Sequence, residues 1–297
     1  MKFGNVFRLS AAAVALLVLV GCQPKSEKLL LGGSGWKKVV IVDKESKQIE
    51  WEHALEAGEE CNSVEYTADG NILYSYSKGA KLITKDHKVI WNIAAPKGAE
   101  MQTANILPNG DFLLAYAGHP ATIMEVSKEG KVLSTTTYET GIESPHSQFR
   151  QVHKNSRGNY MMPLFATSDI REISPKGEVV KIVKVGGTPF AALELENGNF
   201  LVACGDAHGY KEINFDTEKV VREVKQNDIE GASLFFVAGL LPTAQGGEYI
   251  CNWQGHGGDA DASKLPQLIE VDKNGKMVWS LNDNATFGMI SAISIAE

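Results

Sequence analysis

Histidines in the second half of the chain come with other groups that can bind ligands or transfer protons. His146, His208 and His256 each lie in a segment rich in Gly, Ser, Pro or Asp. Imidazole titrates near neutral pH and can act as a general base or a nucleophile. Neighbouring residues add a guanidinium, a carboxylate, amides and an indole. The candidate ligand-binding or catalytic residues are His146, Arg150, Gln151, Asp206, His208, Asn252, Trp253 and His256, with His119 as a secondary candidate.

The same pattern does not favour a metal site. Three imidazoles and a carboxylate could hold zinc or copper, but no short HxH or HExxH spacing is present. Asp259 and Asp261 resemble a calcium loop only in their acidity. The sequence also lacks a Walker loop, a Rossmann fingerprint, a GxSxG motif and a paired CxxC. No metal site is predicted, and the cofactor stays unknown.

Composition narrows the class of protein. The 297 residues are 43% hydrophobic and 22% charged, with a net charge of -7. These values are typical of a globular chain and exclude collagen, coiled coils and a polytopic membrane protein. An acidic chain without a basic patch is not expected to bind nucleic acid. Four cysteines are too few for a disulfide scaffold, and Cys61, Cys204 and Cys251 occur in strand-like settings.

Two kinds of β-hairpin alternate along the chain. The first has an apolar triplet, a polar turn and a second apolar pair that often ends in Trp. Its six copies lie at 40–51, 82–91, 124–133, 172–180, 212–221 and 269–279. The second turns at a glycine, at Gly70, Gly110, Gly158, Gly198 and Gly247, with separations of 40, 48, 40 and 49 residues. This period is typical of four-stranded propeller blades, and almost no helix is expected.

The two ends of the chain supply the missing sixth glycine hairpin. Residues 29–33 resemble a second strand of other blades, and residues 289–295 resemble a first strand that has lost its turn. Together they would complete a sixth blade and close the ring, which leaves no open sheet edge. We therefore predict an all-β, six-bladed β-propeller of four-stranded antiparallel blades over residues 29–297, closed by the C-terminal strand in the N-terminal blade.

Antiparallel order within a blade assigns each connection to one face of the ring. With strands A to D numbered outward, the short A-to-B and C-to-D turns share one face, and the longer B-to-C and D-to-A connections share the other. The candidate histidines map to this second, loop-rich face, as does His53. Function is usually carried by loops on a rigid scaffold. We therefore expect a concave, loop-rich mouth that holds a ligand, with positive character that favours an anionic group.

The first twenty-two residues indicate export. Lys2 and Arg8 precede an apolar run over 11–20 that is too short to span a bilayer but has signal-peptide length. Residues 19–22, LVGC, resemble the lipobox of bacterial lipoproteins. We predict a signal peptide over 1–21, a lipidated N-terminus at Cys22 with a tether over 22–28, and an exported lipoprotein in the outer membrane, facing the periplasm or the cell surface. The lipid bilayer would then be a partner through acylated Cys22.

The segments 197–208 and 249–257, with Phe149, Arg150 and Gln151, resemble the secreted bacterial proteins called PQQ-binding-like β-propeller repeat proteins. The resemblance covers most of residues 28–297 and implies the propeller fold. Quinone binding is doubtful, since quinoprotein dehydrogenases use a longer, eight-bladed ring with a disulfide between adjacent cysteines. The chain is also similar to six-bladed bacterial arylsulfotransferases in placing histidines at the mouth of the ring.

Two functions from different classes follow. In the first, the protein is a lipid-anchored binding or scaffolding module for a small molecule, glycan or protein at its loop-rich face. In the second, it is a hydrolase or transferase with His146, His208 or His256 as base or nucleophile and Arg150 at an anionic substrate. Deep, convergent imidazoles would favour the enzyme, and separate, solvated imidazoles would favour the binding module.

Overall fold

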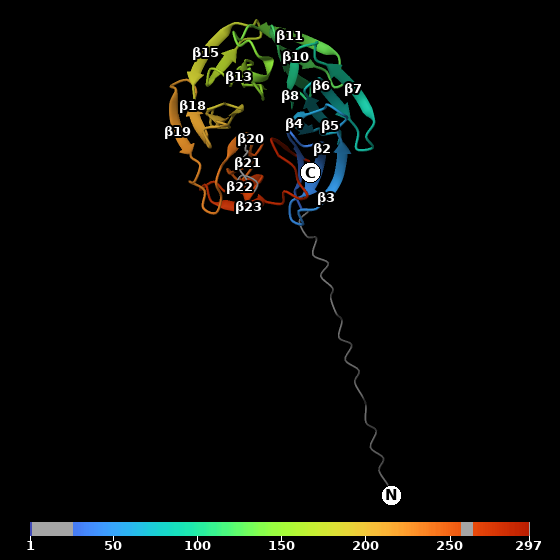
Figure 1. Cartoon of the computed structure of the whole chain (residues 1–297). Coiled ribbons are helices and arrows are strands. Elements are labelled where there is room, and N and C mark those ends of the chain that lie inside the picture. The colour runs from blue at the N-terminus through green and yellow to red at the C-terminus, as the bar shows by residue number, and fades with distance from the viewer. Residues whose placement is uncertain (2–25, 257–263, 297) are drawn as a thin grey trace.

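The strands form a ring of six blades. The computed structural model describes Met1, residues 26–256 and residues 264–296. Each blade is a four-stranded antiparallel meander, and the blades follow one another around a central axis (Figure 1). A single-turn 3-10 helix, Pro145–Ser147, lies in the connection between blades 3 and 4. The predicted all-β, six-bladed propeller is confirmed.

Each blade consists of four strands that follow one another from the axis outward. Blade 1 holds β24 (Ala292–Ile295), β1 (Lys28–Gly32), β2 (Lys38–Asp43) and β3 (Ile49–Ala54); blade 2 holds β4 (Cys61–Tyr66), β5 (Ile72–Tyr76), β6 (Gly79–Ile83) and β7 (Val89–Ala94). Blade 3 holds β8 (Glu100–Ile106), β9 (Phe112–Ala117), β10 (Ala121–Val126) and β11 (Val132–Tyr138); blade 4 holds β12 (His153–Lys154), β13 (Tyr160–Leu164), β14 (Asp169–Ile173) and β15 (Val179–Lys184). Blade 5 holds β16 (Ala191–Glu194), β17 (Phe200–Ala203), β18 (Tyr210–Asn214) and β19 (Lys219–Val224); blade 6 holds β20 (Phe236–Pro242), β21 (Glu248–Trp253), β22 (Leu268–Val271) and β23 (Met277–Leu281).

The C-terminal strand closes the ring as predicted. β24 is the inner strand of blade 1 and pairs antiparallel with β1, with Leu31 opposite Ile293. The C-terminus therefore lies beside the blue first blade (Figure 1). The strand is shorter than the expected 289–295. Just before it, the backbone oxygen of Ser291 accepts from the Gly239 amide at 3.0 Å, which ties the closing segment to blade 6.

Each blade is also joined to the next by a side chain on its outer strand. The indole nitrogens of Trp51, Trp91 and Trp279 donate to the backbone oxygens of Lys85, Lys128 and Lys44, at 2.8, 3.0 and 3.0 Å, in the C-to-D turn of the following blade. In blades 4 and 5, Lys181 and Arg222 occupy the equivalent positions and bind Asp216 and Glu248 of the next blade. The recurring Trp of the sequence repeat therefore supplies a directed polar contact as well as packing.

The A-to-B turns share one conformation. In each, a glycine with positive φ donates its amide to the backbone oxygen three residues earlier, as Gly70 does to Thr67 at 2.9 Å. A side chain at that φ is strained, which explains the glycine. In blade 6 the residue with positive φ is Gly246, at 83°, rather than the expected Gly247.

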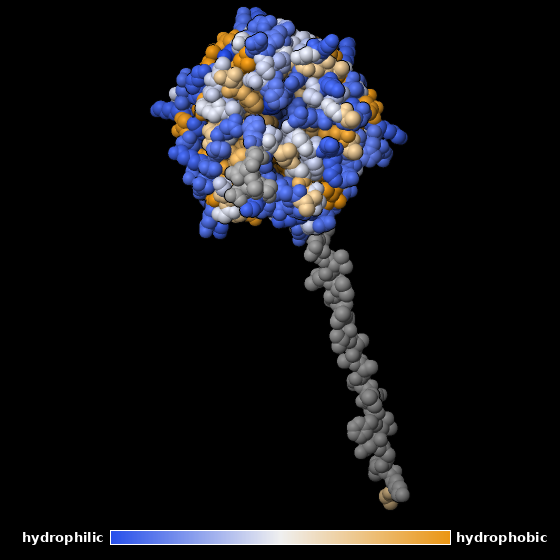
Figure 2. Space-filling view, viewed as in Figure 1, coloured by the Kyte–Doolittle hydropathy of each residue, from blue (hydrophilic) through white to orange (hydrophobic). Residues whose placement is uncertain are grey.

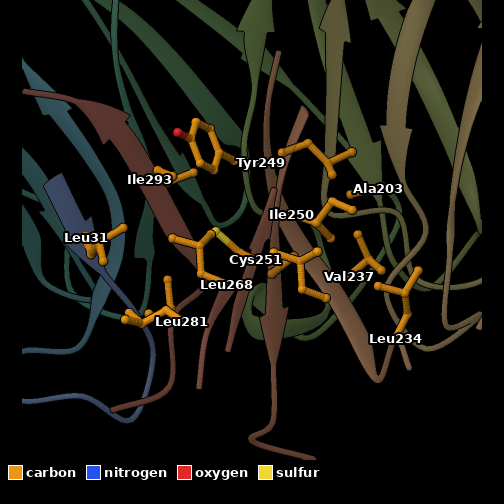
Figure 3. Close-up of a cluster of buried hydrophobic side chains, with 14 of the residues drawn as sticks. Leu31, Ala203, Leu234, Val237, Tyr249, Ile250, Cys251, Leu268, Leu281 and Ile293 are labelled. Atoms are coloured by element: carbon orange, nitrogen blue, oxygen red, sulfur yellow. The ribbon is translucent and has the colours of Figure 1, made fainter. Parts of the chain in front are cut away.

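The core lies between the blades. One buried cluster joins blades 6 and 1: it contains Leu31 of β1 with Tyr249, Cys251, Leu268 and Leu281 of blade 6, all of them buried (Figure 3). Apolar residues remain on the outer strands, where they lie around the rim among hydrophilic ones (Figure 2). The most exposed of these are Val89, Leu133, Val180, Val220, Val221 and Val278.

Deleting residues 292–297 should destabilise the whole ring. The deletion removes the β24 ladder and the buried Ile293 side chain, and it opens the β1 edge. One large apolar side chain contributes about 1.5–3 kcal/mol, and typical domains unfold at about 5–15 kcal/mol. We expect a loss of several kcal/mol in chemical denaturation. Ile295→Ala, at a side chain that is 38% exposed, is the matched control and should change stability little. Equal stability of the truncated and parent chains would show that the ring does not depend on this strand.

Candidate functional site

The six inner strands surround a channel with two different mouths. The inner strands start where the D-to-A connections end, so the loop-rich mouth is bordered by the residues that precede them. The opposite mouth is bordered by the short A-to-B turns. The predicted site residues come mainly from the first mouth, and a cavity of about 690 Å³ lies at the second.

Arg150 is held rigidly at the loop-rich mouth. Its Nη1 donates to the backbone oxygens of His146 and Phe149, at 2.8 and 3.0 Å, and its Nη2 donates to His146 Nε2 at 3.2 Å. His146 Nδ1 therefore carries the proton of the neutral ring and donates to Glu100 at 3.0 Å. That hydrogen bond keeps the pKa of Glu100 below its ordinary value. The 3-10 turn Pro145–Ser147 positions His146 for both contacts.

Arg150 has no carboxylate partner within ion-pair distance among the described residues. Glu100 and Glu60 act on it only from a longer range, and burial lowers the pKa of its guanidinium to about 10. The group stays charged at neutral pH. Its Nε and one hydrogen on Nη2 have no acceptor in the described chain. A half-buried charge without a counterion is costly, so this geometry suits an added anion.

Aromatic rings continue from Arg150 around half of the mouth. The guanidinium carbon lies 4.6 Å from the centre of the Phe165 ring. Phe190 lies 6.2 Å from Phe165 and 6.1 Å from Phe236, and Trp253 lies 5.3 Å from Phe236. Phe190 and Phe236 are buried, whereas the terminal rings, Phe165 and Trp253, are half-buried. We call these four rings the aromatic arc.

A second polar cluster lies at the far end of the aromatic arc. His256 Nδ1 lies 3.0 Å from Asp206, whose other oxygen accepts from Thr188 at 3.1 Å. The His256 ring also packs 4.9 Å from Trp253. Because Asp206 accepts the Nδ1 proton, Nε2 carries the lone pair of the neutral ring. Both side chains are exposed, at 54% for His256 and 46% for Asp206.

The remaining predicted residues are placed differently. His208 is half-buried and its Nδ1 contacts the backbone oxygen of Phe235. Asn252 is fully buried, accepts from the Phe235 amide, and donates to two backbone oxygens, so it fixes the loops of blade 6. Gln151 lies on the wall of the channel cavity, and Nε2 of the exposed His119 lies 2.6 Å from the backbone oxygen of Glu143. The structure therefore brings together His146 with Arg150, and Asp206 with His256 and Trp253, as two clusters joined by the aromatic arc.

His53 does not lie at the mouth. It is in outer strand β3, and its Nδ1 lies 3.1 Å from Nδ1 of His87 in the neighbouring C-to-D turn. Trp51 stacks on both rings, at 6.1 and 5.3 Å. The expectation that His53 belongs to the loop-rich face is wrong, because the outer strand of blade 1 runs alongside the turn of blade 2.

The A-to-B mouth leads into a cavity of about 690 Å³ that sequence reasoning missed. His153 and Glu65 line it from inner strands β12 and β4. Burial lowers the pKa of His153 to about 4 and raises that of Glu65 to about 7. Perturbed groups in a cavity are candidates for function. Because side chains alternate between the two sides of a strand, the sequence of each inner strand could have indicated which of its residues face the channel.

Several expectations concern other groups. Among the described residues, no three His, Cys, Asp or Glu side chains are arranged to hold a metal ion, and no helix is long and apolar enough to cross a membrane. Cys61, Cys204 and Cys251 are buried and unpaired. Cys22, Asp259 and Asp261, with residues 2–21, lie outside the described residues.

Fold and site together define a six-bladed β-propeller with a loop-bordered mouth. A family model of Mal s 1 allergenic protein-like proteins matches residues 25–276, so the chain belongs to that family. This differs from the PQQ-binding-like family expected from the sequence, although the propeller fold is shared. No curated protein matches the chain.

Solved structures agree with this fold. A Bacteroides caccae protein of unknown function is 58% identical, with a TM-score of 0.89 over 91% of this chain and 98% of that one. A catalytically inactive virginiamycin B lyase from Staphylococcus aureus, solved with quinupristin, is 14% identical, with a TM-score of 0.59 over 88% of this chain and 87% of that one. A nidogen/laminin complex contains a chain that is 11% identical, with a TM-score of 0.64 over 91% of this chain and 98% of that one. The last two show the fold alone.

Glu65→Gln should change how stability depends on pH. The unfolded chain ionises this carboxyl near its ordinary pKa of 4.5, whereas the folded chain keeps it protonated up to about 7. Stability is therefore lost as pH rises through this window, and the neutral amide avoids the loss. We expect the variant to gain about 1–3 kcal/mol relative to the parent between pH 5 and pH 8. Glu196→Gln, in an exposed turn, is the control. A gain that is equal at both pH values would contradict the assignment.

Proposed function

We propose that the protein is a binding module that holds a small anionic ligand with a flat ring at its loop-rich mouth. The observation that carries this proposal is the unpaired Arg150 guanidinium, which is fixed by three hydrogen bonds and has free donors. Such a donor set matches a carboxylate, sulfonate or phosphate oxygen pair. The stacked Phe165 ring extends the same surface and suits a planar ligand.

The imidazoles favour binding over catalysis. His146 uses both ring nitrogens within the protein, and its side chain is 66% exposed. His208 is bonded to backbone, and His256 lies in the other cluster. No described histidine is therefore next to Arg150 with a free nitrogen. This arrangement matches the separate, solvated imidazoles expected of a binding module.

Benzenesulfonate is a suitable probe because it combines a flat ring with an anion that does not titrate. We expect Arg150→Gln to weaken its affinity at least about tenfold in calorimetry, which corresponds to about 1.4 kcal/mol. Phe165→Ala should weaken it less. Neutral benzenesulfonamide should bind the parent chain weakly, since it lacks the charge that Arg150 attracts.

The control variant is Lys97→Gln, at an exposed lysine in a D-to-A connection of the same face. It removes one positive charge without touching Arg150, so it should leave the affinity for benzenesulfonate unchanged. Equal affinity of the parent and Arg150→Gln chains, with both folded, would refute the proposed site.

We further propose that the chain is exported and anchored by lipid at Cys22. The sequence LVGC at 19–22 and the preceding apolar run support this location. Strand β1 starts at Lys28 on the A-to-B side of the ring, so a tether there would leave the loop-rich mouth facing away from the membrane. Cys22→Ala should abolish fatty-acid labelling and membrane association in a bacterial host. Persistent labelling of that variant would contradict the anchor.

The Asp206 and His256 pair supports a second candidate, a hydrolase or transferase. A carboxylate on Nδ1 and a lone pair on Nε2 are the arrangement that a general base needs. For this function, cleavage of 4-nitrophenyl acetate, phosphate or sulfate should fall about a hundredfold or more in His256→Ala. The rate of cleavage should also fall in Asp206→Asn. If the parent chain binds benzenesulfonate but cleaves none of these esters, the enzyme function is refuted and the binding function remains.

A further inference from the structure

The inner strands place one equivalent residue from each blade in a layer across the channel. In blades 2 to 6 this residue lies five positions before the turn glycine with positive φ, and in blade 1 it lies on β24. All six residues line the cavity of about 690 Å³ at the A-to-B mouth, which has the volume of a small-molecule site. We call them the channel layer: Glu65, Asn105, His153, Leu193, Leu241 and Ile293.

Glu65 turns an unused oxygen toward this cavity. Its Oε2 accepts from the Ser294 hydroxyl at 3.1 Å, whereas its Oε1 has no hydrogen-bond partner in the described chain. Unlike Nε2 of His153, this Oε1 is not closed off from solvent, and the Glu65 side chain is half-buried. No cation of the described chain acts on the carboxyl. A carboxylate that has lost most of its water and has no counterion is costly, so a bound cation would be stabilised there.

Asn105 adds a second free acceptor beside Glu65. Their inner strands, β8 and β4, are neighbours, so the two residues are adjacent in the channel layer. Asn105 Nδ2 donates to the Val152 oxygen at 2.8 Å and lies 3.2 Å from His153 Nδ1, which orients the amide. Its Oδ1 has no partner in the described chain and is open to the cavity, although only 7% of the residue is exposed. The side-chain amide of Gln151, also on the cavity wall, is not bonded to any described residue and supplies a further oxygen.

The other charged groups of the cavity are already bonded within the protein. Lys154 is paired with Glu125 at 2.6 Å, and Glu194 accepts from a backbone amide and a hydroxyl of blade 4. None of these charges affects the pKa of Glu65, which burial raises to about 7. His153 is neutral, because burial lowers its pKa to about 4. The cavity lining thus holds three carboxylates and one ammonium, so it attracts cations once Glu65 is ionised.

We propose that this cavity binds a small organic cation, a primary ammonium with an apolar body, at Glu65 and Asn105. An ammonium has three N–H donors, which match the free oxygens of Glu65, Asn105 and Gln151. The apolar body packs on Leu193 and Leu241 of the channel layer. An inorganic cation would leave that apolar surface in water, and no three His, Cys, Asp or Glu side chains of the described residues are arranged to hold a metal ion. The site is separate from the loop-rich mouth and does not rest on the function proposed there.

Hexylammonium chloride is the probe, and hexanol and hexanoate are its uncharged and anionic counterparts. At pH 8 most of the Glu65 carboxyl is ionised, while an alkylammonium keeps its proton. We expect hexylammonium to bind at least about tenfold more tightly than hexanol or hexanoate in calorimetry at this pH. Its affinity should fall about tenfold from pH 8 to pH 6, because protonation of Glu65 removes the charge that the ammonium needs.

Variants of the folded chain assign the binding to this cavity. Glu65→Gln should lower the hexylammonium affinity at least about tenfold and remove its dependence on pH between 6 and 8. The matched control is Glu196→Gln, which removes one carboxylate from an exposed A-to-B turn at the same mouth and should change the affinity little. Leu241→Asn should weaken hexylammonium more than ethylammonium, since only the longer chain covers the apolar residues. Arg150→Gln should leave the hexylammonium affinity unchanged.

Carbon NMR of the Glu65 carboxyl reports on the site directly, and hexylammonium should lower the pKa of this group in the parent chain. Equal binding of hexylammonium and hexanol, or parent-like affinity of folded Glu65→Gln, would overturn the proposal. A Glu65 signal that hexylammonium leaves unchanged, or that responds to calcium ions instead, would overturn it as well. Failure of benzenesulfonate binding would refute only the Arg150 site, because hexylammonium binding is measured independently.

Discussion

Closure of the ring is the constraint on which the rest of the structure depends. Each blade buries apolar side chains against its neighbours in the ring. Every interface therefore requires the next blade, and the interface of the last blade requires the first. β24 meets that need by pairing with β1, and the Trp279 indole adds a hydrogen bond from blade 6 to Lys44 in blade 1. Without closure, β1 would present an open edge and the core between blades 6 and 1 would be exposed to water.

Closure also positions the functional groups. Inner strands from six blades converge on one axis, which brings residues distant in sequence, such as Glu100 and His146, into contact. Inner-strand side chains of all six blades line one cavity at the A-to-B mouth, among them Glu65, His153, Glu194 and Ile293. The aromatic arc crosses blades 4, 5 and 6 at the loop-rich mouth, and Arg150 stands at one end of it.

The repeats predicted the fold because each uses the same local physics. Turn glycines fix the hairpins, and the recurring Trp marks the outer strand that touches the next blade. The half-blades at the two ends predicted closure, although residues 289–291 lie before β24 rather than in it. Topology also predicted that His146 and Arg150 would share the loop-rich mouth, since the order of strands alone assigns each connection to a face.

Other features required side-chain geometry. The sequence does not show that Asn252 turns inward to bind backbone, because loop direction depends on contacts with Phe235 and Pro266. Nor does it show that Phe165, Phe190 and Phe236 form an arc, since they come from three different blades. His153 was set aside as a strand residue. The structure places it in the wall of the cavity at the A-to-B mouth and shows that its Nε2 is closed off from solvent without a hydrogen-bond partner among the described residues.

The central proposal is that Arg150 forms a preformed anion site at the loop-rich mouth. The most direct measurement is a crystal structure of residues 26–297 grown with selenate, whose anomalous signal locates the anion without ambiguity. We predict selenate within hydrogen-bond distance of Arg150 Nε and Nη2, beside the Phe165 ring. A Glu60 or Glu100 carboxylate bonded to those nitrogens, with selenate absent from the mouth, would contradict this central claim.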